Sequence, residues 1–125
     1  MPCPEPLSRI AAAADLSRSP LRHGARVVEG DPHHNDFTVR LEARGPAGER
    51  LEPHDLELEI YRSGDGVNLT LAWHHDDSRP MLWQGCHAVW MDPEGRRCGA
   101  PSDGAPLEAL ARRLRALFAA GDLSD

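Results

Sequence analysis

The sequence predicts an α+β fold: a four- to five-stranded antiparallel meander sheet, a C-terminal amphipathic helix packed on one face and a short N-terminal helix. Residues 37–44 and 56–61 alternate apolar and polar side chains with a period of two, which is typical of half-buried strands. A Ser-Gly-Asp-Gly turn at 63–66 follows the second of these strands. Residues 107–118 carry apolar side chains at helical spacing.

Length and composition favour one domain that spans residues 1–125. The chain is 40% hydrophobic and 27% charged, which is typical of a globular protein. A chain of this length buries roughly two-thirds of the surface that it exposes when unfolded. We therefore expect a core that needs no disulfide or metal ion.

The N-terminal third contains the weakest signals. Three prolines fall within residues 1–6, so we expect no regular structure there. Residues 7–35 are predicted to form a short helix, with Leu7, Ile10 and Ala14 on one face, followed by an irregular polar segment.

The predicted sheet covers residues 36–98, and its pairing follows from the turn at 63–66. If Asp65-Gly66 forms a type I′ loop, Leu58 faces Trp73 and Glu57 faces His74. Glu57 and Glu59 could then be neutralised from the preceding strand, which carries Arg40, Glu42 and Arg44. The apolar faces of the two strands match in this register.

The segment 81–91 is predicted as one strand that is apolar on both faces. One set of side chains is Met81, Trp83, Val89 and Met91, and the other is Leu82, Cys86, Ala88 and Trp90. A strand of this kind needs cover on both faces. We expect the C-terminal helix to cover the first set, so that the N-terminal segment, a second copy of the chain or another protein covers the second.

The C-terminal helix is predicted over residues 104–120. Asp103 can cap its start, Pro106 is tolerated in the first turn, and Gly121 ends it. Its apolar stripe is typical of a helix that lies on a sheet.

Charge and cysteine content indicate compartment and partners. The net charge is −6 with neutral histidines, which disfavours binding to nucleic acid or to an anionic membrane. The three cysteines lack CxxC spacing, and no signal peptide or membrane span is visible. We therefore expect a cytoplasmic protein with reduced thiols.

No motif in the chain indicates a catalytic reaction. The leading hypothesis is a small binding or protein-interaction module without catalysis and without a cofactor. Its partner is another protein or a second copy of the chain. The predicted interaction surface is formed by Leu82, Trp83, Cys86 and Trp90.

The alternative is a metal-binding protein or metal-dependent enzyme with a divalent metal such as zinc. Imidazole and carboxylate groups are common zinc ligands, and the meander places several at one end of the sheet. The candidate ligands are His54, His74, His75, Asp76 and Asp77. His74 and His75 would point to opposite faces of a regular strand. A metal-free enzyme whose acid and base meet only in the folded chain also stays open.

Overall fold

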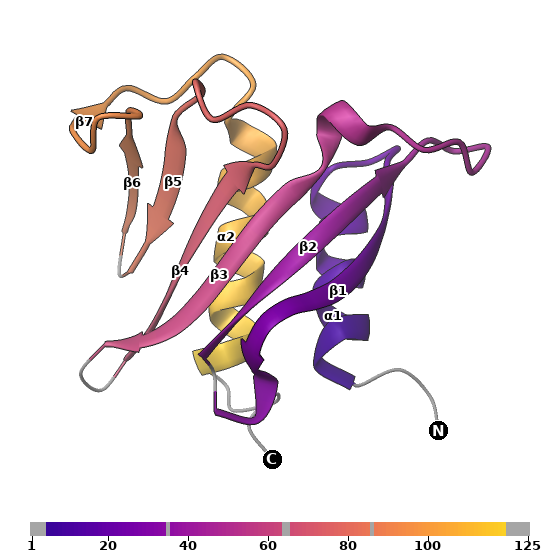
Figure 1. Cartoon of the computed structure of the whole chain (residues 1–125), viewed down its shortest axis with the longest axis horizontal. Coiled ribbons are helices and arrows are strands. Elements are labelled where there is room, and N and C mark those ends of the chain that lie inside the picture. The colour runs from indigo at the N-terminus through magenta and orange to yellow at the C-terminus, as the bar shows by residue number, and fades with distance from the viewer. Residues whose placement is uncertain (1–4, 35, 64–65, 86, 120–125) are drawn as a thin grey trace.

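The computed structural model describes residues 5–34, 36–63, 66–85 and 87–119. Within these ranges, seven antiparallel strands form one sheet in sequence order, and both helices pack on the same face of it (Figure 1). The elements are α1 (Glu5–Ser17), β1 (Arg22–Asp31), η1 (Pro32–His34), β2 (Asp36–Arg44), η2 (Glu52–His54), β3 (Leu56–Ser63), β4 (Gly66–Trp73), β5 (Met81–Gln84), β6 (Ala88–Met91), β7 (Arg97–Cys98) and α2 (Ala105–Ala119). The predicted α+β architecture is confirmed, but the predicted number of strands is too low.

The first additional strand is β1, which lies in the segment predicted to be irregular. Exposed and partly buried residues alternate along β1, as in other strands. Its partly buried residues include a polar one, His23, besides Ala25 and Val27, so the sequence does not alternate clearly between apolar and polar side chains. It pairs with β2 from Arg22↔Arg44 to Asp31↔Asp36 and forms an edge of the sheet. An edge strand buries little apolar surface, which is why its sequence pattern is weak.

The second additional strand arises because residues 81–91 form a hairpin and not one strand. Leu82 of β5 pairs with Trp90 of β6, and a turn lies between them. A Cβ atom at Gly85 would lie 2.5 Å from the Trp83 ring. The turn therefore needs glycine where the indole passes close to the backbone.

The N-terminal helix begins earlier than predicted. Glu5 and Pro6 belong to α1, which corrects the expectation that residues 1–6 have no regular structure, and residues 1–4 lie outside the described part of the chain. Proline is tolerated in the first turn because its missing N–H group would have no partner in the helix.

The β3–β4 register differs from the predicted one by two residues. Leu58 pairs with Leu71 and Glu57 with Ala72, and Ser63↔Gly66 is the last pair before the loop. A shift of two residues leaves every side chain on its predicted face. The predicted pairing of Leu58 with Trp73 was therefore wrong, but the predicted core face was correct.

A single core lies between the sheet and the two helices. Fully buried side chains from both layers meet there, including Ile10 of α1, Leu58, Leu71 and Leu82 of the sheet, and Leu110 of α2. Each contributes about 1.5–3 kcal/mol to stability through burial. In the described part of the chain, no helix is long and apolar enough to cross a membrane. We refer to the sheet face opposite the helices as the open face.

Candidate functional site

One half of the open face carries a group of apolar side chains, with the polar Asn68 and Thr70 of β4 among them. Side chains at alternate positions of neighbouring strands gather there, and we call them the Trp83 patch: Tyr61, Met81, Trp83, Val89 and Met91. All five are partly exposed, and none belongs to the buried core. The Trp83 indole Nε1–H donates to the Tyr61 hydroxyl oxygen at 2.7 Å, which fixes the two rings relative to each other.

The predicted interaction surface on strand 81–91 is corrected by this arrangement. Leu82 is fully buried and Trp90 is 5% exposed, and both face the helices. The Trp90 Nε1–H donates to Glu108 of α2 at 2.6 Å, and its ring stacks on Trp73. Leu82 and Trp90 are therefore covered although their set was expected to be free, whereas Ala88 of the same set is exposed. Of the predicted surface, Trp83 lies on the open face, and Cys86 lies outside the described residues.

The reason for this inversion lies in the pairing of β4 with β5. Leu82 pairs with Leu71, whose side chain already faces the core, and paired residues share a face. Alternation within residues 81–91 separates the two sets but cannot tell which one faces the helix. The sequence signal that was missing is therefore the β4–β5 register.

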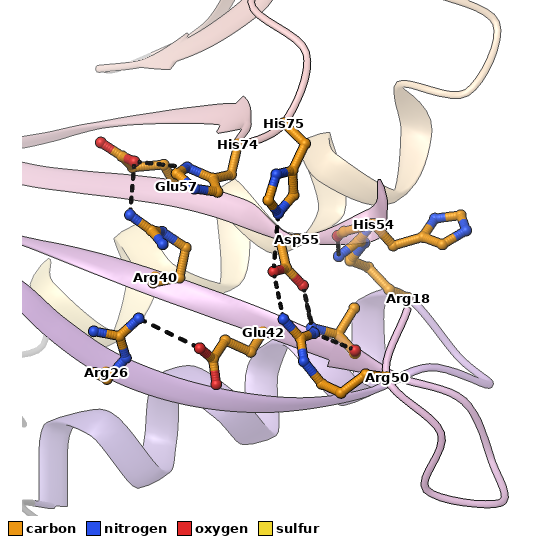
Figure 2. A network of polar contacts seen from close by, with 11 residues as sticks. Arg18, Arg26, Arg40, Glu42, Arg50, His54, Asp55, Glu57, His74 and His75 are labelled. Carbon is orange, nitrogen blue, oxygen red and sulfur yellow. Dashed lines mark hydrogen bonds and ion pairs between the residues drawn. The ribbon is translucent and has the colours of Figure 1, made fainter. Parts of the chain in front are cut away.

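The other half of the open face is covered by paired charges (Figure 2). Arg26 of β1 contacts Glu42 of β2 at 3.4 Å, and Arg40 contacts Glu57 at 3.6 Å. His74 Nδ1 lies 3.2 Å from the same Glu57 carboxylate. The predicted neutralisation of Glu57 by Arg40 is confirmed, because the two residues are direct cross-strand partners.

The histidine-rich end of the sheet brings together only part of the predicted metal site. The rings of His74 and His75 lie 4.5 Å apart, because β4 ends at Trp73 and strand alternation no longer separates them. They approach different carboxylates: His75 Nε2 lies 3.5 Å from Asp55, whereas His74 approaches Glu57 (Figure 2).

The other three candidate ligands do not converge with this histidine pair. His54 is exposed, and its backbone carbonyl accepts a hydrogen bond from Arg18. Asp76 accepts hydrogen bonds from the backbone N–H and hydroxyl of Ser78, and Asp77 is exposed. Within the described ranges, no three histidine, cysteine or acidic side chains are grouped so that they could hold a metal ion.

Asp55 organises this end of the sheet. It is 2% exposed, and its carboxylate accepts hydrogen bonds from the backbone N–H of Ala43 at 2.8 Å and from both terminal nitrogens of Arg50 at 2.8 and 2.9 Å. Burial by itself would raise the pKa of Asp55, but the hydrogen bonds from Arg50 and Ala43 outweigh it and lower the pKa to about 2. The carboxylate is therefore a structural anchor between β2, β3 and the segment that precedes η2.

Sequence reasoning placed Asp55 beside the histidines but did not identify Arg50. The arginine lies in the β2–β3 connection, among polar residues with no periodic pattern. A contact of this kind depends on the path of the loop, and the sequence carries no signal for it.

Residues 7–117 match the model of a family described as a domain of unknown function (DUF8659), and the chain belongs to this family. The match extends from the first turns of α1 to the end of α2 and includes every strand. No curated protein and no solved structure matches the chain.

Proposed function

We propose that this protein is a non-catalytic binding module that uses the Trp83 patch as its interaction surface. The observation that carries the proposal is the grouping of aromatic and aliphatic side chains on a sheet face that neither helix covers. Trp and Tyr are enriched at the centres of protein interfaces because they bury a large area and keep a polar group that can be paired. The indole N–H of Trp83 is already paired with the hydroxyl oxygen of Tyr61.

The occupant that we propose is the same patch of a second copy of the chain. Two sheets pack face to face when their apolar faces meet, with a spacing of about 10 Å. Several charges beside the patch form opposite-charge pairs within each copy, such as Arg26 with Glu42 and Arg40 with Glu57, whereas Glu59 of the same face is exposed. These internal pairs reduce the repulsion between two copies, although the whole chain carries a net charge of −6.

This arrangement also supports a binding module over the alternative of a metal site. The apolar side chains of the patch converge on one surface, whereas the five predicted metal ligands are divided among different partners. A protein partner is favoured over nucleic acid because two arginines of the open face, Arg26 and Arg40, are engaged by carboxylates.

The test is the oligomeric state, measured by sedimentation velocity as a function of concentration. We expect a reversible dimer with a dissociation constant on the order of 10–100 µM, as a small interface gives. Val89→Glu places a charge in the patch and should weaken dimerisation at least about tenfold, since an unpaired charge in an apolar interface costs more than 1.4 kcal/mol.

Leu16→Glu is the matched control. It makes the same chemical change at a side chain that is 66% exposed on α1, away from the open face. It should leave the dimer unchanged. A wild-type protein that stays monomeric up to about 1 mM would overturn the proposal, because an interface weaker than that is not specific.

A further inference from the structure

A cavity of about 460 Å³ opens at the end of the sheet where α1 ends and α2 begins. Its size lies within the range of small-molecule sites. The walls are mainly apolar and include Leu21, Pro53, Trp73 and Leu107. Polar and charged residues also line it, among them Ser17, His54, Arg79 and Asp103, and the most deeply buried charged residue is Arg18.

Arg18 is a buried cation that forms no ion pair with a carboxylate among the residues that the structure describes. It is 7% exposed, and its Nη1 atom donates to the backbone carbonyl of His54 at 2.9 Å and lies 3.1 Å from Nε2 of His23 (Figure 2 shows Arg18 beside His54). The N–H groups on Nε and Nη2 have no acceptor among the residues that the structure describes. Burial lowers the pKa of Arg18 to about 10, although the charges of Asp55 and Asp103 oppose this.

The guanidinium is held in place by a chain of partly buried contacts. His23 has a fully buried side chain, and its Nδ1 lies 3.0 Å from the carboxylate of Asp15. With its proton on Nδ1, the imidazole donates to Asp15, and its Nε2 accepts from Arg18. Asp15 and His23 therefore act as positioning residues that fix one side of the guanidinium and leave the other side for a ligand.

The other charges that line the cavity neutralise each other. Arg79 donates to both carboxylate oxygens of Asp103, and its guanidinium lies 3.5 Å from the centre of the Trp73 ring. Because Asp103 pairs with Arg79, it does not occupy the position beside Arg18 that a ligand carboxylate would take. Among the described residues of the cavity wall, Arg18 is therefore the cation without a direct ion pair, and its charge is positive.

We propose that this cavity binds a small organic carboxylate with an apolar body. The carboxylate pairs with the free side of the Arg18 guanidinium, which presents the planar donor geometry that a carboxylate accepts. The apolar body lies against Trp73 and Leu107. Such a group occurs both in a free aromatic or aliphatic acid and at the C-terminus of a peptide. The cavity shares no residue with the Trp83 patch, so a test of carboxylate binding does not depend on whether the protein dimerises.

The test is an NMR titration of the wild-type protein with 3-phenylpropionate and with its neutral amide, following the Nε–H signal of Arg18 and the indole N–H of Trp73. We expect saturable shifts of both signals with the acid and at least about tenfold weaker binding of the amide, because the amide loses a charge-assisted pair. The comparison needs no mutation, so it does not depend on a variant that folds. Equal affinity for acid and amide, or no binding of the acid up to about 10 mM, would overturn the proposal.

Variants then assign the effect to Arg18. Arg18→Gln should weaken binding of the acid at least about tenfold while leaving the amide unchanged. Arg97→Gln is the matched control, since Arg97 is exposed on β7 and does not line the cavity, and should bind like the wild type. Titration with N-acetyl-Ala-Phe identifies the source: tighter binding of this peptide than of 3-phenylpropionate assigns a peptide C-terminus, and weaker binding assigns a free acid.

Discussion

Asp55 joins three parts of the chain through one carboxylate. It accepts from Ala43 in β2, from Arg50 in the following connection, and lies 3.5 Å from His75 beyond β4. Asp55→Asn keeps the shape of the side chain but removes the charge that Arg50 pairs with. We expect a loss of about 2–3 kcal/mol in the free energy of unfolding, as for hydrogen bonds to charged groups. Urea denaturation measures it, and Asp77→Asn, at an exposed position, should change stability by less than about 0.5 kcal/mol.

The same carboxylate makes stability depend on pH in the acid range. The pKa of Asp55 is about 2 in the folded protein, against 3.8 for an ordinary aspartate. Because the folded pKa is the lower one, the stabilisation is fully present above pH 3.8 and is lost as the pH falls through about 2. The Asp55→Asn variant should show a smaller loss of stability over this interval. An unchanged pH profile would mean that Asp55 is not the group responsible.

His23 adds a pH dependence in a different range. Burial lowers the pKa of His23 below its ordinary 6.5, and the hydrogen bond to Asp15 opposes this only in part. The unfolded chain therefore takes up a proton near pH 6.5 before the folded protein does, so stability falls as the pH drops below 6.5. Thermal unfolding between about pH 7.5 and 5 measures this change of stability with pH. The change should be smaller in His23→Gln than in the wild type, and it should be unchanged in His87→Gln, whose side chain is exposed.

Among the secondary-structure elements, helix α1 contributes directly to the hydrophobic core. Ile10 is fully buried between the helix and the sheet, whereas Leu16 on the same helix is 66% exposed. Ile10→Ala should lower the free energy of unfolding by about 2–4 kcal/mol, the cost of a buried cavity. Leu16→Ala should cost less than about 0.5 kcal/mol. Equal effects of the two variants in urea denaturation would show that α1 does not dock as described.

The elements that the sequence predicted correctly are those with strong periodicity. Apolar side chains alternate with polar ones from Phe37 to Arg44, and β2 forms there as expected. The leucines of α2 recur at helical spacing over several turns, and this helix also forms as expected. β1 was missed because the positions that it turns toward the helices include His23 and only small apolar side chains, Ala25 and Val27. An edge strand can be stable with so little burial because β2 supplies its hydrogen bonds.

The candidate sites were harder to predict because they depend on how the whole molecule is assembled. Trp83 was expected in an interaction surface and lies on the open face, but Leu82 and Trp90 were assigned to the wrong side. The Arg18 cavity was not predicted at all. Its walls come from the ends of α1 and β4 and the start of α2, which are distant along the chain. No local pattern can indicate such a meeting.

The order of the strands has a consequence for how the chain acquires its structure. Each strand pairs with the one before it, from β1 to β7, so successive hairpins can form locally while the polypeptide is being synthesised. Closure of the core is different, because α1 packs beside α2 and about ninety residues separate them. Until α2 emerges from the ribosome, the leucine-rich side of the nascent sheet is covered only by α1. This is the stage at which chaperone binding or aggregation competes with folding.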